Sequence, residues 1–143
     1  MTKRKISPCV ALFLFALLVS GPMSALAQDI ARKRVSFDAG KSSAEAKGSI
    51  TGYQVVDYVL GAKAGQEMTV AMKSSNRSSY FNVLPPASET ALFIGSTSGK
   101  EWKGTLPTDG DYSIRVYLMR NAARRDETAE YTLSIRIAAG ANE

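Results

Sequence analysis

The chain of 143 residues has no histidine and only one cysteine, Cys9. The lack of imidazole excludes Ser-His-Asp and Cys-His catalysis and histidine-bound zinc. No glycine-rich run has the spacing of a phosphate-binding loop. A pair of carboxylates, as used by glycosidases, remains possible in principle. We therefore expect a protein that is not an enzyme, with no catalytic residues and no cofactor.

Only one long hydrophobic run is present, Val10–Val19, and it is too short to span a bilayer. It follows the basic residues Lys3–Lys5 and precedes Ala25–Ala27, which fits a small-x-small cleavage site. We expect residues 1–27 to be a cleaved secretory signal peptide and residues 28–143 to be a single exported, periplasmic domain. An uncleaved anchor helix is the alternative.

Removal of this signal would change both the charge and the cysteine content. The whole chain has 18 Lys and Arg against 13 Asp and Glu. Three of the bases and none of the acids lie in residues 1–27, so the remainder carries 15 minus 13, or +2. That balance does not favour nucleic-acid binding, which needs a broad basic face. Cys9 would leave with the signal, so the domain would have no thiol or disulfide and would depend on its core.

Short apolar runs alternate with polar residues and end at Gly, Pro, Ser or Asn, which predicts an all-β fold. We expect a single-domain antiparallel β-sandwich of about eight strands, starting with a strand at Arg34–Phe37 after a loose end at Gln28–Lys33. A sixth strand is expected at Ala91–Gly95. The two strongest patterns, Asp111–Leu118 and Tyr131–Ile137, each place four apolar side chains on one face, so we expect them to form a strand pair. Residues 119–126 allow a short helical turn.

Between these two strands lies the arginine segment Arg120–Arg125, and Arg115 lies close before it. Exposed connections on a rigid sheet often carry binding residues, and arginines match carboxylates in charge and fork geometry. Neutralisation by Asp126, Glu127 and Glu130 on the surface is the alternative.

Two other segments offer weaker sites. The run Ser74–Ser79 is either a solvated connection or a polar binding loop beside the arginine segment. Asp109-Gly110-Asp111 offers calcium only two carboxylates, whereas calcium takes six to eight oxygens. We therefore expect turn residues there and no metal site.

Four segments in order resemble the periplasmic inhibitors of g-type (goose-type) lysozyme. They are Gly40–Ala44, Gly48–Tyr53, Ala62–Gln66 and Ser113–Arg124. The resemblance covers nearly all of residues 28–143. It implies a compact antiparallel β-sandwich whose partner is g-type lysozyme. It also implies that Arg120, Asn121, Arg124 and Tyr53 bind that partner.

Our hypothesis from the sequence is an exported inhibitor that blocks the active-site cleft of g-type lysozyme by stoichiometric binding. Two alternatives stay open: a non-catalytic module that binds cell-wall polysaccharide or another envelope protein, and a carboxylate-based wall hydrolase.

Overall fold

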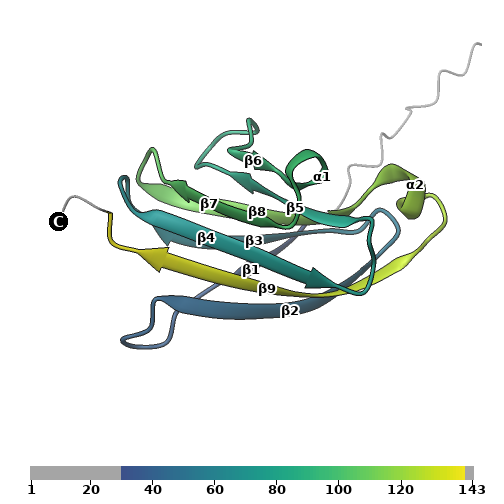
Figure 1. The fold of residues 1–143 in the computed structure, drawn as a ribbon, viewed down its shortest axis with the longest axis horizontal. Helices are drawn as coiled ribbons and strands as arrows, with labels where there is room; N and C mark the ends of the chain where they lie inside the picture. Colours follow the sequence, from purple (N-terminus) through teal and green to yellow (C-terminus); the bar gives the residue numbers. More distant parts are fainter. Residues whose placement is uncertain (1–29, 141–143) are drawn as a thin grey trace, which may run out of the picture.

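The computed structural model describes residues 30–140 as two β-sheets that pack face to face (Figure 1). One sheet has five strands in the order β1-β3-β8-β5-β6, and the other has four in the order β2-β9-β4-β7. The strands are β1 (Ile30–Arg34), β2 (Ser43–Thr51), β3 (Val55–Ala62), β4 (Glu67–Ser74), β5 (Ser79–Leu84), β6 (Phe93–Ile94), β7 (Glu101–Thr105), β8 (Gly110–Leu118) and β9 (Thr128–Ala138). Two helical turns, α1 (Gly95–Ser98) and α2 (Arg120–Ala123), complete the fold. The expected all-β sandwich is confirmed, with nine strands in place of about eight.

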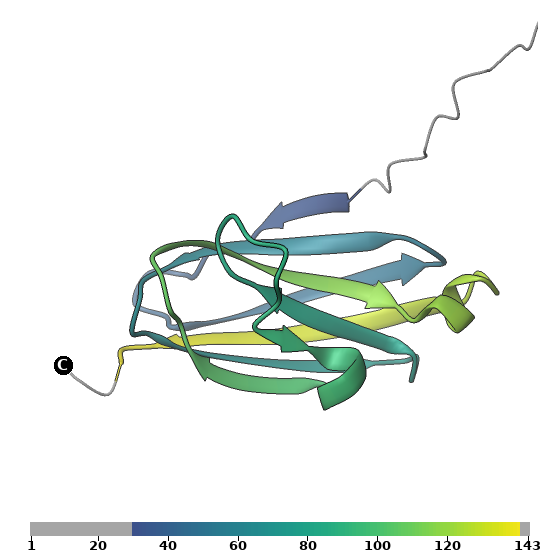
Figure 2. The same ribbon diagram turned by 90° about the horizontal axis from the view of Figure 1, so that it is seen from above.

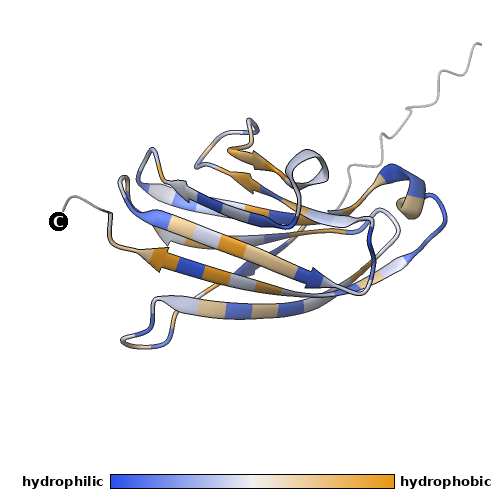
Figure 3. Ribbon diagram, in the orientation of Figure 1, coloured by the Kyte–Doolittle hydropathy of each residue, from blue (hydrophilic) through white to orange (hydrophobic). Residues whose placement is uncertain are grey.

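Alternation along the strands decides which side chains enter the core. Successive side chains of a strand point to opposite faces, so residues two apart share a face. Figure 3 shows this as alternating hydrophobic and hydrophilic bands on the strands. The buried layer draws on both sheets and includes Tyr58, Leu60, Met68, Val70, Phe81, Val83, Tyr112, Ile114, Val116, Leu133 and Ile135. At about 1.5–3 kcal/mol for each large side chain, this layer supplies the main stabilisation of a domain that has no disulfide.

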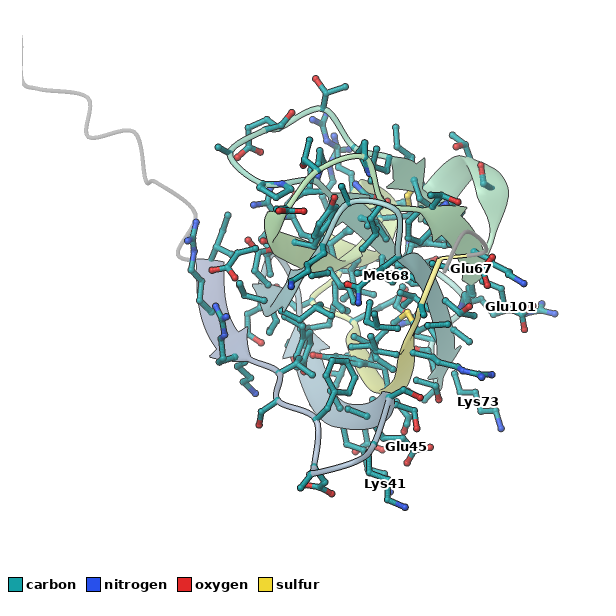
Figure 4. All side chains as sticks on the ribbon, turned by 90° about the vertical axis from the view of Figure 1, so that its left-hand side faces the viewer. Lys41, Glu45, Glu67, Met68, Lys73 and Glu101 are labelled. Carbon is teal, nitrogen blue, oxygen red and sulfur yellow. The ribbon has the colours of Figure 1, made fainter. Side chains whose placement is uncertain are left out.

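Side chains on the outer faces are mostly polar. In Figure 4, which looks along the sandwich, Glu45, Lys73 and Glu101 project outward, whereas Met68 lies inside and is fully buried. The turn before β8 is fixed by the hydroxyl of Tyr112, which donates to the carbonyl oxygen of Thr108 at 2.7 Å.

The prediction that the last two long strands pair with each other is wrong. β8 lies between β3 and β5 in one sheet, and β9 lies between β2 and β4 in the other. The connection through α2 carries the chain from one sheet to the other, so the apolar faces of β8 and β9 meet across the core. The alternation of apolar and polar residues predicts which face of a strand is buried. The same alternation is expected whether two strands pair within one sheet or face each other across the core, so it does not distinguish the two arrangements.

The start of the domain also differs from expectation. The predicted loose end Gln28–Lys33 contains most of β1, and the first strand is Ile30–Arg34, not Arg34–Phe37. β1 runs parallel to β3, with Ile30 opposite Val55, and makes the one parallel pair among the described strands. The cations of β1 do not form the alternating apolar pattern from which strands are predicted, but a charged strand is tolerated at a sheet edge. Figure 2 shows β1 along that edge.

The expected strand at Ala91–Gly95 is reduced to Phe93–Ile94, followed at once by α1. Gly95 packs so close to the backbone of Phe81 that an added Cβ would lie 2.4 Å from its carbonyl oxygen, and the chain turns there. The helical turn expected at 119–126 is present as α2. No helix within the described residues is long and apolar enough to cross a membrane. The expected signal peptide, residues 1–27, lies outside residues 30–140.

Candidate functional site

Three connections gather at one end of the sandwich, which we call the tip. They are the β2–β3 turn (Gly52–Gln54), the β4–β5 loop (Ser75–Ser78) and the β8–β9 connection (Met119–Glu127). Figures 1 and 2 show the tip, with α2, at the end of the sandwich opposite the C-terminal end of β9. Backbone hydrogen bonds tie the connections together: Gly52 N–H donates to the Glu127 carbonyl at 3.0 Å, and Met119 N–H donates to the Ser78 carbonyl at 2.8 Å. The tip is therefore one continuous surface.

The α2 turn exposes its arginines because its alanines are buried. Ala122 and Ala123 are almost completely buried against the core, and their small side chains let the turn pack closely on the end of the sandwich. Arg120 and Arg124 are exposed. The backbone N–H of Arg124 donates to the carbonyl of Arg120 at 3.0 Å, so the two residues are one helical turn apart and lie on one side.

Two of the four arginines of this region are held by carboxylates of the part of the chain that the structure describes, and the other two are not. Arg125 is bound within the chain, since its Nε donates to Oε1 of Glu127 at 2.8 Å. Arg115 lies further along β8 and is bound to Asp57. Arg120 and Arg124 form no ion pair with any residue in the range 30–140. Neutralisation by neighbouring acids, the alternative from the sequence, thus holds for Arg125 only.

Asn121 is exposed and uses part of its side chain to shape the turn. Its Oδ1 accepts the backbone N–H of Ala122 at 2.9 Å, which satisfies one of the unpaired donors at the start of α2. Because Oδ1 of Asn121 is engaged by this bond, the amide nitrogen is the part of the side chain that remains as a donor.

Tyr53 reaches the surface on the neighbouring turn and is 55% exposed. Gly52 has a φ of 60°, a left-handed conformation that glycine adopts without strain, and this turns the chain sharply before Tyr53. A Cβ added to Gly52 would lie 2.9 Å from Oδ1 of Asp126, so the two connections are in close contact. Tyr53 and Arg120 line the same groove. The structure therefore brings together two of the predicted site residues, while Arg124 lies outside the groove on the same turn as Arg120.

The β4–β5 loop supports this arrangement from the other side. Asn76 Nδ2 donates to Oε2 of Glu127 at 2.9 Å and to the carbonyl of Thr128 at 3.2 Å. Its Oδ1 accepts the backbone N–H of Ser78 at 2.8 Å. The hydrogen bond from Asn76, and then the hydrogen bond from Arg125, hold the pKa of Glu127 below its usual range. The loop Ser74–Ser79 does lie beside the arginine segment. Its hydrogen bonds to Glu127 and Thr128 support the connection that carries these arginines.

The two turn carboxylates have structural partners. Oδ1 of Asp109 accepts the backbone N–H of Ala64 at 2.7 Å, and Asp111 pairs with Arg34 at 2.8 Å on the surface. Within residues 30–140, no three His, Cys, Asp or Glu side chains gather where they could hold a metal ion.

Sequence reasoning missed part of the groove. Besides Tyr53 and Arg120, its walls include Asn82, Arg115 and Tyr117 on the outer face of the five-stranded sheet. Arg115 and Tyr117 belong to the polar face of a strand whose apolar face is Tyr112, Ile114, Val116 and Leu118. A polar outer face is the ordinary expectation for such a strand, so only the position of the groove distinguishes these residues.

Comparison with known proteins gives consistent results. No family model matches the chain. An Escherichia coli (strain K12) protein named inhibitor of g-type lysozyme is 31% identical over 130 residues, which are 89% of this chain and 93% of that protein. The crystal structure of Aeromonas hydrophila PliG, a periplasmic lysozyme inhibitor of g-type lysozyme, superposes with a TM-score of 0.71 at 39% identity over 76% of this chain and 97% of that one.

A second solved structure, Salmonella Typhimurium PliG, also described as a periplasmic inhibitor of g-type lysozyme, gives a TM-score of 0.60 at 28% identity over 76% of this chain and 98% of that one. Each of these likenesses covers about three quarters or more of this chain and nearly all of the other one. With this coverage and identity, the chain belongs to the family of periplasmic inhibitors of g-type lysozyme.

Proposed function

We propose that this protein is a periplasmic inhibitor of g-type lysozyme that blocks the active-site cleft by stoichiometric binding. It is not an enzyme, and residues 1–27 are the signal that exports it. The observation that carries the proposal is the tip, where Tyr53 and Arg120 line one groove and Arg124 stands exposed on the same turn. Family membership supports the choice of partner.

The chemistry of the tip suits a glycosidase cleft. Such enzymes place carboxyl groups in a cleft that holds a sugar polymer. Arg120 and Arg124 have no carboxylate partner within residues 30–140, so both guanidinium groups can form charge-assisted hydrogen bonds with acids of the enzyme. Asn121 adds an amide donor, and Tyr53 adds apolar area with a hydroxyl, a residue type common in interface hot spots.

An inhibition assay tests the function. Residues 28–143 should stop g-type lysozyme from clearing a cell-wall suspension at about equimolar ratio, as expected of a tight protein complex. Unchanged lysozyme activity at excess inhibitor would reject the proposal. Turnover of the wall by the protein alone would reject its non-enzymatic part.

The site is tested separately. The double change Arg120→Ala with Arg124→Ala should weaken inhibition. The expected loss of binding free energy is about 2–5 kcal/mol, the usual cost of removing a desolvated charge partner. Arg125→Ala is the matched control, because Arg125 is engaged by Glu127 within the chain. Full inhibition by the double variant would move the site elsewhere on the molecule without rejecting the function.

Export is tested by the N-terminus of the protein recovered from the periplasm. Cleavage after Ala27 would leave only two residues before β1 begins at Ile30. Recovery of a chain that starts at Gln28 is expected, and a chain that still starts at Met1 would contradict it.

A further inference from the structure

The groove that begins at the tip continues along the outer face of the five-stranded sheet. Tyr53 and Arg120 line it at the tip. Asn82, Arg115 and Tyr117 line it on the outer face of the sheet, and we call these three residues its floor; the other lining residues are Gly52, Gln54, Val55 and Leu118. No carboxylate is among these residues.

Strand register explains why the floor residues meet. Asn82 on β5 and Asp57 on β3 are both directly opposite Arg115 on β8. Residues that face each other across a ladder point to the same side of the sheet. Ile114 and Val116, the neighbours of Arg115, point into the core, so Arg115 and the residues opposite it point outward. The sheet thereby fixes the spacing of the floor groups.

Arg115 lines the groove and is held by Asp57. Its Nε donates to Oδ1 of Asp57 at 2.8 Å, and its Nη2 donates to Oδ2 of the same carboxylate at 2.9 Å. Nη1 reaches only Glu89, at 3.3 Å, and Glu89 is 86% exposed. An exposed ion pair of this kind contributes little, so Nη1 is the part of the guanidinium that another acceptor can take over.

Asn82 lines the groove, and its side-chain amide has a fixed orientation. Its Oδ1 accepts the backbone N–H of Gly95 at 3.2 Å and the hydroxyl of Tyr117 at 3.1 Å. A backbone N–H can only donate, so the oxygen must point to Gly95 and the orientation of the amide is settled. Nδ2 makes no hydrogen bond with any described residue. The two hydrogens of Asn82 Nδ2 can therefore be donated to an acceptor of a partner.

We infer that the binding surface extends from the tip into this groove and that the groove takes an acidic loop of the partner enzyme. The inference rests on the proposed function and deepens it. A carboxylate of the loop would accept from Asn82 Nδ2 and from Arg120, with Nη1 of Arg115 as a further donor. The rings of Tyr53 and Tyr117 would pack against its apolar atoms.

The donors favour an acidic loop over a sugar chain. Every sugar hydroxyl both donates and accepts a hydrogen bond. The strongest hydrogen-bonding groups of the groove are the guanidinium donors of Arg115 and Arg120 and the amide donor of Asn82, and no carboxylate lines it to accept from hydroxyls. A carboxylate only accepts, so it matches what the groove supplies. The groove is also continuous with the tip, so one partner can engage both.

Asn82→Asp tests the inference with little change to the fold. A carboxylate at this position can still accept from Gly95 N–H and from the Tyr117 hydroxyl, but the two free donors are replaced by negative charge. Like charges placed together at an interface are strongly unfavourable, so we expect inhibition to weaken by about 10- to 100-fold. Ser134→Asp is the matched control, because it adds the same charge on the exposed outer face of the other sheet. It should inhibit like the unchanged protein.

The outcomes separate the two levels of the proposal. If the unchanged protein does not inhibit, the proposed function itself fails. If it inhibits and Asn82→Asp matches Ser134→Asp, with equal urea midpoints, the groove is not part of the interface and this inference is overturned. If Asn82→Asp abolishes sedimentation with purified peptidoglycan and leaves inhibition intact, the groove binds a glycan and the acidic-loop inference is wrong. Selective loss of inhibition by Asn82→Asp supports it.

Discussion

The guanidinium of Arg115 binds the carboxylate of Asp57 through two parallel hydrogen bonds, at 2.8 and 2.9 Å, although Asp57 is only 1% exposed. Arg115→Ala would leave that carboxylate buried without a counter-ion. We expect the free energy of unfolding to fall by about 3–5 kcal/mol, as for other broken buried pairs. Urea unfolding followed by circular dichroism measures this loss.

The control for that measurement is Arg34→Ala. Arg34 also pairs with an aspartate, Asp111, but both side chains are more than half exposed. Its removal should cost at most about 1 kcal/mol. Equal losses for the two variants would mean that burial does not distinguish the two pairs.

A second pair of buried polar groups lies between the sheets. The hydroxyls of Tyr58 and Tyr131 are 2.7 Å apart, and both residues are buried. Tyr131→Phe would leave the Tyr58 hydroxyl without this partner, at a cost of about 1–3 kcal/mol. The double change of both tyrosines to Phe removes both polar groups and should be less destabilising than the single change. A double variant that loses the sum of both single losses would contradict this account.

The same pair predicts how stability depends on alkaline pH. Burial, and then the hydrogen bond to Tyr58, raise the pKa of Tyr131 above the ordinary tyrosine value of about 10. The folded state therefore keeps this phenol protonated at a pH where the unfolded chain releases the proton. The contribution of the Tyr131 phenol to the free energy of unfolding is complete below about pH 10 and declines as the pH rises further. Urea midpoints measured from pH 8 to pH 11 should fall less steeply for Tyr131→Phe than for the unchanged protein.

The sequence predicts the long strands well because their apolar side chains recur at every second residue. The pattern at Tyr112, Ile114, Val116 and Leu118 leaves little doubt about the buried face. Alternation does not, however, say which strand lies beside which, and this is why the pairing of β8 with β9 was wrong. β1 was missed because hydrogen bonds to β3, and not burial, hold its charged residues in the sheet.

The site divides in a similar way. The exposed arginines follow from a polar connection between two buried strands, and Tyr53 follows only from the family resemblance. That Tyr53 and Arg120 share a groove depends on the contact between two connections far apart in the chain. Asn82 carries no signal in the sequence, because a polar residue on an outer strand face is unremarkable until the register places it opposite Arg115.

The tip geometry predicts a specific effect at Gly52. Gly52→Ala would place a side chain in the left-handed region and bring its Cβ to 2.9 Å from Oδ1 of Asp126. We expect a loss of about 1–2 kcal/mol of stability from the backbone alone. Inhibition should weaken further, because this turn places Tyr53 in the groove that Arg120 also lines.

Gly65→Ala is the control for this experiment. Gly65 also has a positive φ, 84°, but a Cβ there would meet nothing within 4 Å, and it does not belong to the tip. It should show a similar backbone penalty with unchanged inhibition. Equal losses of inhibition in both variants would show that the tip contact does not matter for binding.

The brace beneath the arginine segment can be tested through the acidity of Glu127. The hydrogen bond from Asn76 lowers its pKa most, and the hydrogen bond from Arg125 comes second. A carboxyl with a lowered folded-state pKa stabilises the fold above its unfolded value of about 4.3, and this contribution is lost as the pH falls below it. Asn76→Ala should therefore raise the pKa of Glu127, measured by NMR titration, because it removes the largest single cause of the lowered value. An unchanged pKa in this variant would show that Arg125 alone, and not the amide of Asn76, holds Glu127 in its ionised form beneath α2.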